Sequence, residues 1–320
     1  MDEARGRMIS MLDLGIIIVN YNVCDLLRDC LKSVYASRGV TLDTCVVDNA
    51  SPDDSADMVA REFPQVHLIR NSDNSGYAAA NNLGLKWFGF GSQRSAVSGQ
   101  PSELPRYALL LNPDTIVPSD AFAKMIQLMD ERPDFGAAGP KLVRLDGSLD
   151  LACRRSFPSI EVSFWRLTRL SKLFPRSRRF GRYNMTYLDP DQPAEIDSVV
   201  GACMLVRREA ILQAGLMDEI FWMYGEDLDW AYRIKQVGWR VYYYPQVVVQ
   251  HVKRASSTGS ARAKYEFDRA MWLFYCKHYQ AQTPGWLDGL VRFGIGLKGG
   301  RQLRAEIRRH LSGPVRQDAA

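Results

Sequence analysis

The stretch GIIIVNYNVCDLLRDCLKSVYASRGVTLDTCVVD, residues 15–48, decides the fold of this chain. It begins and ends with short apolar runs rich in β-branched residues, Gly15–Asn20 and Thr44–Asp48, which predict two buried strands. Between them, Cys24–Ala36 carries its apolar side chains at helical spacing. A strand, a helix and a second strand in immediate succession predict a crossover unit, and therefore parallel neighbours in one sheet.

The alternation continues along the first third of the chain and predicts an α/β protein with a mostly parallel, Rossmann-like sheet flanked by helices. Ser51 and Pro52 predict the start of the next helix, as its N-cap and its first helical position. Gly89–Arg106 is rich in Gly, Ser and Pro, which predicts a surface insertion. Further strands are expected at Val66–Arg70, Tyr107–Asn112, Asp197–Val206, Trp239–Tyr244 and Val247–His251, and further helices at Tyr77–Trp87, Ala121–Asp130, Arg208–Ala214 and Leu228–Val237.

The composition excludes several classes of protein. Of the 320 residues, 46% are hydrophobic and 24% are charged, which is typical of a soluble globular chain and excludes a disordered or collagen-like one. The longest clearly apolar run, Leu14–Val19, is far shorter than the ~20 residues of a membrane-spanning helix. Residues 1–13 lack the apolar segment of a secretory signal. The six cysteines match no zinc-ligand spacing, so we expect reduced core residues in a cytoplasmic protein.

Polar side chains follow each of the predicted N-terminal strands, for example at Asn20, Asp48 and Asn112. Ligands of open parallel sheets bind at the carboxyl ends of the strands, so these residues predict a ligand crevice. No dinucleotide fingerprint or P-loop occurs near them, which leaves carboxylates, amides and a metal ion to hold a nucleotide-like ligand. Asp114, in an Asn-Pro-Asp turn, is the candidate ligand for Mg²⁺ or Mn²⁺, and His251 could complete that site.

The pair Glu226-Asp227 stands in a loop with aromatic neighbours, among them Trp222 and Tyr224. Acids at the start of a helix also favour the helix dipole, and that alone could explain the pair. Acids beside so much aromatic surface favour a pocket in which one carboxylate acts as general base.

The order of motifs along the chain resembles a known family. The motifs are IVNYN at 18–22, VVDNAS at 46–51, NSGYAAANN at 74–82, LLNPD at 110–114, VVGACMLVRR at 199–208 and YGEDLDWAYRIKQVGW at 224–239. In this order, over about residues 14–254, the chain resembles the family-2 inverting glycosyltransferases of the GT-A fold, in particular their rhamnosyltransferase-like branch.

The resemblance implies roles for individual residues. Asp227 would be the catalytic base, and Glu226 would orient it or the acceptor. Asp114 ends the family's D-x-D motif, which here begins with Asn112, so metal binding would rest on Asp114 and His251. The donor would contact Asn20, Asn22, Asp48, Asn49, Gly76, Asn81, Asn112 and Asp114, and the acceptor Gly201, Ala202, Trp222 and Tyr224.

The function implied is transfer of a sugar, with dTDP-L-rhamnose as the expected donor, to a hydroxyl of a polyprenyl-diphosphate-linked saccharide in cell-wall or surface polysaccharide synthesis. UDP-galactofuranose and UDP-GlcNAc remain alternative donors, and a non-catalytic nucleotide-sugar-binding module is a remote alternative. No nucleic-acid-binding motif occurs. We expect an N-terminal tail at 1–13, a nucleotide-sugar-binding half at 14–115, an acceptor-binding and catalytic half at 116–255, and a basic amphipathic helical extension at 256–320.

Two segments mix bulky apolar residues with an excess of bases. Arg154–Arg182 contains nine bases and one acid, Glu161, and Pro284–Arg309 contains six bases and two acids. A solvated face is one interpretation. The other is binding to an anionic membrane surface, which places the protein peripherally on the inner face of the plasma membrane.

Overall fold

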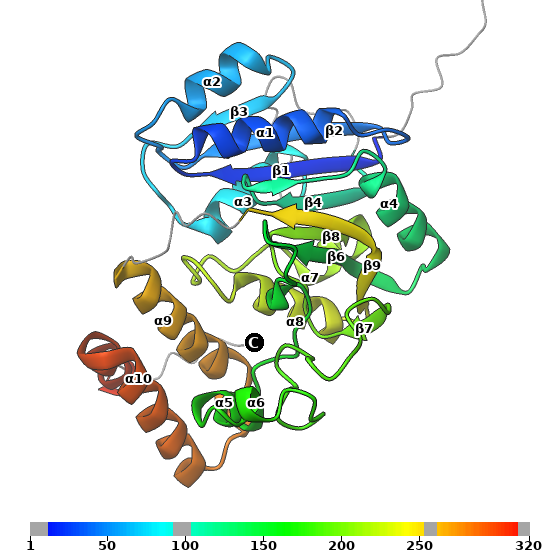
Figure 1. The fold of residues 1–320 in the computed structure, drawn as a ribbon. Helices are drawn as coiled ribbons and strands as arrows, with labels where there is room; N and C mark the ends of the chain where they lie inside the picture. Colours follow the sequence, from blue (N-terminus) through cyan, green and yellow to red (C-terminus); the bar gives the residue numbers. More distant parts are fainter. Residues whose placement is uncertain (1–11, 92–103, 253–260, 313–320) are drawn as a thin grey trace, which may run out of the picture.

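The computed structural model describes residues 12–91, 104–252 and 261–312. Nine strands form one mixed sheet in the order β3-β2-β1-β4-β8-β6-β9-β5, with β7 paired to β9 (Figure 1). The strands are β1 Leu14–Asn20, β2 Leu42–Asp48, β3 His67–Arg70, β4 Tyr107–Leu111, β5 Thr115–Ile116, β6 Phe135–Val143, β7 Ala194–Ile196, β8 Cys203–Arg207 and β9 Arg240–His251. Strands β1, β2, β3 and β4 pair in parallel with their neighbours in this group, and β6 pairs in parallel with β9. The antiparallel pairs are β4 with β8, β6 with β8, β5 with β9 and β7 with β9.

The predicted crossover units are confirmed. Every residue of β1 is buried, and β1 pairs with β2 in parallel from Leu14 opposite Leu42 to Asn20 opposite Asp48. Ten α-helices accompany the sheet in the described ranges: α1 Cys24–Tyr35, α2 Ser55–Glu62, α3 Tyr77–Trp87, α4 Ala121–Glu131, α5 Ile160–Leu167, α6 Leu170–Leu173, α7 Arg208–Ala214, α8 Glu226–Gln236, α9 Ala261–His278 and α10 Gly285–Ser312. Two short 3₁₀ turns lie at Leu151–Cys153 and Gln280–Gln282.

The helical extension predicted near the C-terminus contains α9 and α10. Helix α9 joins the rest of the fold through Ala270 and Phe274, which pack with Phe221 and Leu228. Helix α10 packs on α9 around Trp272 and departs from helical geometry at Gly300. Together with α5 and α6, these helices form the end of the molecule opposite α2 (Figure 1).

Three local predictions differ from the structure. Helix α2 begins at Ser55, not after Ser51, because the Ser51 amide donates to Asp48 Oδ2 and the Ser51 hydroxyl oxygen accepts from the Asn22 amide. The strand expected at Asp197–Val206 begins later, since β8 spans Cys203–Arg207. The two strands expected on either side of residue 245 are one strand, β9, with an irregular register opposite β6.

Two predictions fall largely on residues that the structure does not describe. Residues 92–103 of the expected surface insertion and residues 1–11 of the expected N-terminal tail lie outside the described ranges. The nucleotide-sugar-binding and acceptor-binding halves remain a prediction. Strands of both expected halves belong to the same sheet, in which β4 pairs with β1 on one side and β8 on the other.

Candidate active site

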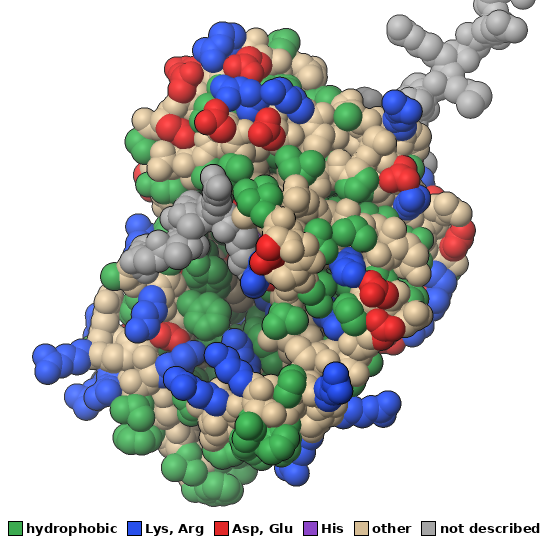
Figure 2. All heavy atoms as spheres, viewed as in Figure 1, with side chains coloured by type: hydrophobic (Ala, Val, Ile, Leu, Met, Phe, Trp, Pro, Cys, Tyr) green, Lys and Arg blue, Asp and Glu red, His purple; other side chains and the backbone are tan. Residues whose placement is uncertain are grey.

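A cavity of about 730 Å³ opens at the edge of the sheet where β1 and β4 end. Figure 2 shows it as a hollow between the two ends of the molecule, with hydrophobic side chains at its centre and basic ones along its rim. The loop at 199–202, the aromatic loop at 222–225, the start of α8 and one face of α9 also line it. The crevice predicted from the strand ends is therefore part of a larger cavity.

Some predicted donor residues line this cavity, and others support it from behind. Asn49, Asn112 and Asp114 are among the lining residues. Asn20 and Asp48 are buried and hydrogen-bond to each other, Asn20 Nδ2 to Asp48 Oδ1 at 2.9 Å, so they brace the ends of β1 and β2. The structure places the remaining predicted donor residues outside the lining as well: Asn22, Gly76 and Asn81.

The start of α3 and the aromatic loop are joined directly. The Tyr77 amide donates to the Trp222 carbonyl at 2.7 Å, and Trp222 Nε1 donates to the Asn74 carbonyl at 3.3 Å. Gly76 caps α3 with φ of +91°, and a Cβ added there would overlap the Trp222 carbonyl and ring. Gly76 therefore allows the loop to approach the helix closely, which is a different role from donor contact.

The predicted pair of Asp114 and His251 meets at one end of the cavity. His251 Nε2 lies 3.2 Å from Asp114 Oδ1, and His251 Nδ1 lies 3.1 Å from Asp150 Oδ2. Burial alone would lower the pKa of His251, but the hydrogen bonds with the two carboxylates outweigh it and raise that pKa to about 9. Asp150 holds the imidazole as a second carboxylate does for a metal-ligating histidine.

These residues fit a divalent cation in part. In the described ranges no group of three or more His, Cys, Asp or Glu side chains could hold a metal ion. Asp114 and His251 nevertheless offer an oxygen and, once the proton leaves Nε2, a nitrogen to the same point of the cavity. Ions at nucleotide sites take one or two carboxylates and complete their shell with phosphate oxygens and water. Two protein ligands are therefore sufficient for such an ion.

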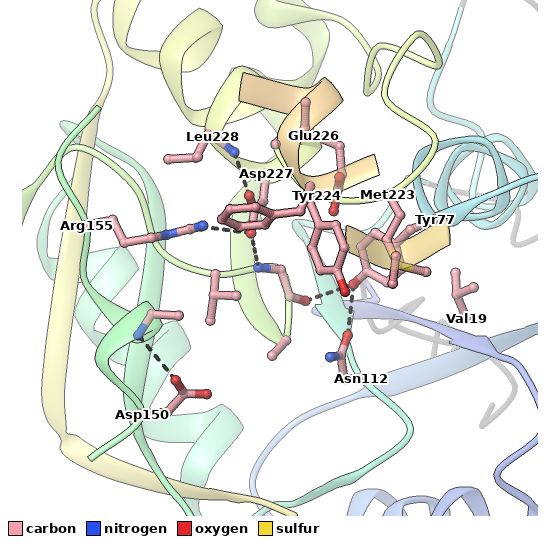
Figure 3. A pocket seen from close by; sticks show the side chains of 18 of the residues that line it. Val19, Tyr77, Asn112, Asp150, Arg155, Met223, Tyr224, Glu226, Asp227 and Leu228 are labelled. Carbon is pink, nitrogen blue, oxygen red and sulfur yellow. Dashed lines mark hydrogen bonds and ion pairs between the residues drawn. The ribbon is translucent and has the colours of Figure 1, made fainter. Parts of the chain in front are cut away.

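Asp227 lies in the first turn of α8 and is held by three donors. Arg155 Nη2 lies 2.8 Å from Asp227 Oδ2, the Gly201 amide donates to the same oxygen at 2.9 Å, and the Leu228 amide donates to Oδ1 at 2.7 Å (Figure 3). One cationic donor and two backbone amides thus occupy both carboxylate oxygens. They also fix Asp227 against the loop that carries Gly201.

Glu226 has the opposite environment although it is the adjacent residue. Its Oε2 is buried and has no hydrogen-bond partner in the described part of the chain. Burial, and then the charge of Asp227, raise the pKa of Glu226 to about 8. Glu226 and Asp227 are therefore adjacent acids in different environments, one without a hydrogen-bond partner at Oε2 and the other bonded at both carboxylate oxygens.

Tyr77 connects the two ends of the cavity. Its hydroxyl lies 3.1 Å from Asn112 Oδ1, at the end of β4, and 3.0 Å from the Gly201 carbonyl oxygen (Figure 3). The Gly201 amide also donates to Asp227. Tyr77 and Gly201 therefore link the end of β4, which precedes Asp114, to the acid pair on α8. All four residues expected to contact the acceptor line the cavity: Gly201, Ala202, Trp222 and Tyr224.

The sequence prediction missed Asp150, Tyr77 and Arg155. It treated Arg154 and Arg155 as part of a basic surface, whereas both are buried. The Arg154 guanidinium donates to the Leu188 and Asp189 carbonyl oxygens, both at 3.0 Å. Nothing in the sequence identifies the distant partners of these two arginines, so it offers no signal that they are buried.

The architecture is that of GT-A glycosyltransferases. The chain superimposes on the crystal structure of GalNAc-T7 with UDP, GalNAc and Mn²⁺ at a TM-score of 0.57, with 16% identity, covering 95% of this chain and 58% of that one. The mannosyltransferase PcManGT of Pyrobaculum calidifontis, in complex with GDP-Man and Mn²⁺, aligns at a TM-score of 0.54 with 15% identity, covering 96% of this chain and 77% of that one. The chain thus spans little more than half the length of GalNAc-T7.

Residues 13–265 match the family described as "Glycosyltransferase like family 2", and the chain belongs to this family. It is similar to the N-acetylglucosaminyl-diphospho-decaprenol L-rhamnosyltransferase of Mycobacterium tuberculosis, with 26% identity over 298 residues, covering 92% of this chain and 94% of that protein. The family and fold predicted from the motifs are confirmed. Of the helices in the described ranges, none is both long and apolar enough to cross a bilayer.

Proposed function

We propose that the protein transfers L-rhamnose from dTDP-L-rhamnose, with inversion, to a hydroxyl of a polyprenyl-diphosphate-linked saccharide during synthesis of a cell-wall or surface polysaccharide. The observation that supports sugar transfer best is that one cavity holds the Asp114–His251 pair and the Glu226–Asp227 pair at different positions on its wall. The mycobacterial relative, which aligns over 92% of this chain, supports the choice of sugar and acceptor.

Asp114 and His251 would hold Mg²⁺ or Mn²⁺ at the end of the cavity formed by β4 and β9, with Asp150 orienting the imidazole. Such an ion, when bound, neutralises negative charge on a leaving diphosphate. Asn49 and Asn112 lie on the same side and offer amide groups to the nucleotide.

Asp227 would accept the proton of the acceptor hydroxyl while that oxygen forms a bond to the anomeric carbon. The bond from this carbon to the diphosphate oxygen breaks on the opposite face, and the electron pair leaves with the diphosphate. Arg155 and the Gly201 amide hold the Asp227 carboxylate in place on the wall of the cavity. Glu226, whose pKa is raised by burial and by the charge of Asp227, would donate a hydrogen bond to the acceptor in its protonated form.

The direct test is transfer by the purified full chain to a polyprenyl-diphosphate-linked GlcNAc, with Mn²⁺ and dTDP-L-rhamnose, UDP-galactofuranose or UDP-GlcNAc as donor. We expect a product with rhamnose alone, of inverted anomeric configuration by NMR. Asp227→Asn should bind the donor normally and lose roughly 10²-fold or more in transfer. A product only with another donor would replace rhamnose in the proposal, and no transfer from any donor would refute it.

A peripheral position on the inner membrane surface is part of the proposal, because the acceptor is a lipid. The amphipathic helices at the C-terminal end support this position, as developed below.

A further inference from the structure

Helix α10 carries a row of large apolar side chains that no described residue covers. One face of the helix packs, since Val291 and Ile295 join the cluster around Trp272. The outer face has apolar residues at intervals of four, three and four, the spacing of a single helix face. Between 59% and 72% of each of these side chains is exposed: Trp286, Leu290, Phe293 and Leu297. A face of this kind is typical of an interaction site.

Helices α5 and α6 extend the same surface from a segment more than 100 residues away in the chain. Ile160 of α5 packs with the cluster of α10, and a Cβ at Gly294 would lie 3.9 Å from Leu167 Cδ2. The exposed apolar residues of this segment are Phe164, Leu167, Leu173 and Phe174. Figure 2 shows hydrophobic side chains gathered at the lower end of the molecule, where Figure 1 places α5, α6 and α10. We refer to the outer faces of α5, α6 and α10 as the apolar end.

Positive charge is concentrated in the segment of the apolar end that contains α5 and α6. Glu161 is the single acid between residues 160 and 182, and its partner is Arg179 at 2.8 Å. The other exposed bases of this segment form no ion pair within the described ranges: Arg169, Lys172, Arg176, Arg178 and Arg182. Apolar side chains next to unpaired bases complement a surface that combines negative charge with accessible hydrocarbon, and an anionic bilayer has both.

The apolar end also adjoins the active-site cavity. Arg166 of α5 lines the cavity and stacks on Tyr183 at 3.8 Å from its ring centroid, while Phe164 and Leu167 of the same short helix are exposed. One helix therefore has its polar side on the cavity and its apolar side on the surface.

We propose that the apolar end docks on an anionic phospholipid bilayer, with α5 and α10 lying along the headgroups and their aromatic side chains entering the acyl boundary. This inference deepens the proposed function, because it places the cavity beside the lipid in which the acceptor's polyprenyl chain is embedded. The acceptor's head group can then reach the cavity past Arg166 without the polyprenyl chain leaving the bilayer.

The test is flotation of the full chain with phosphatidylcholine vesicles that contain or lack phosphatidylglycerol. We expect binding to the anionic vesicles alone, weakened at high salt. The variant Trp286→Ser/Phe293→Ser should raise the Kd at least about tenfold, since each side chain loses part of its burial in hydrocarbon. The matched control is Leu212→Ser on α7, whose side chain is 56% exposed and lies outside the apolar end, and it should bind as the wild type does.

Transfer to a short-chain, water-soluble acceptor separates docking from catalysis. The double variant should keep this activity and lose transfer to acceptor embedded in vesicles. Vesicle binding by a wild-type chain that transfers no sugar would refute the proposed function and leave the docking intact. A wild-type chain that stays unbound at low salt, or a double variant that binds as the wild type does, would refute the docking. A dimer that this variant dissociates, without vesicle binding, would assign the face to a second copy.

Discussion

Arg155→Met removes the charge that faces Asp227 and keeps a side chain of similar length. The side chains of Arg155 and Asp227 are only 9% and 7% exposed, and Arg155 Nη2 also donates to the Val199 carbonyl at 2.7 Å. Loss of one partner of a buried ion pair costs about 3–5 kcal/mol, because the other charge stays buried. The Gly201 and Leu228 amides still donate to Asp227, so we expect a loss of about 3 kcal/mol, near the lower end of that range.

Thermal denaturation measures this loss, which corresponds to a decrease in Tm of roughly 4–5 °C for a chain of 320 residues. Arg179→Met is the matched control, because it breaks an ion pair with Glu161 whose side chains are 67% and 49% exposed. Such pairs contribute about 0–1 kcal/mol. In a double-mutant cycle, Arg155→Met and Asp227→Asn together should cost less than the sum of the single changes by more than about 1 kcal/mol.

Activity gives a second readout of the same residue. The positive charge of Arg155 lowers the pKa of Glu226, so the variant should lose activity at a higher alkaline pH than the wild type. A destabilisation of Arg155→Met no larger than that of Arg179→Met would refute the reasoning. Additive losses in the cycle would show that Arg155 does not act through Asp227.

Three further changes test other parts of the site. Because the folded pKa of Glu226 is raised from 4.5 to about 8, the wild type should lose stability as pH rises through this interval. The Glu226→Gln variant should not show this loss of stability. A difference in Tm between the variant and the wild type that is constant with pH would contradict this prediction. Asp114→Asn should abolish the Mn²⁺-dependent thermal shift caused by a nucleoside diphosphate, whereas full transfer in excess EDTA would exclude a metal. Gly76→Ala should destabilise by about 1–3 kcal/mol through strain and its clash with Trp222. Gly147→Ala, at a left-handed position with open space, measures the strain alone, and equal losses would refute the clash.

The local sequence was sufficient to predict those helices and strands whose hydrophobic pattern matches their burial in the fold. Helix α3 has the predicted bounds, Tyr77–Trp87, and β1 and β2 lie where their apolar runs predict. Burial on both faces of a parallel strand requires a continuous apolar run, so such strands are visible in the sequence. The motifs likewise predicted that Asp114 and His251, 137 residues apart, lie at one edge of the sheet, and they are in contact.

Strand β6 was missed because its local sequence does not have the pattern of a strand. Its sequence FGAAGPKLV contains two glycines and a proline, which disfavour a strand when considered locally. Tertiary packing requires them instead. A Cβ at Gly136 would overlap Trp239, and one at Gly139 would overlap Val199. The backbone of β6 must approach its neighbours closely, and the pairing with β9 compensates for the poor strand propensity.

The sequence by itself thus determined the order of strands and helices in the first third of the chain, the family and the sheet edge at which the acids gather, because these depend on periodicity and on motifs contiguous in the chain. Only the tertiary structure decided which charged residues are buried and what they contact. Arg155 meets Asp227 across 72 residues, and Asp150 meets His251 across 101. A basic residue in a sequence does not reveal its counter-charge, since that partner comes from another element of the fold. The division of Glu226 and Asp227 into an unpaired and a paired acid has the same cause.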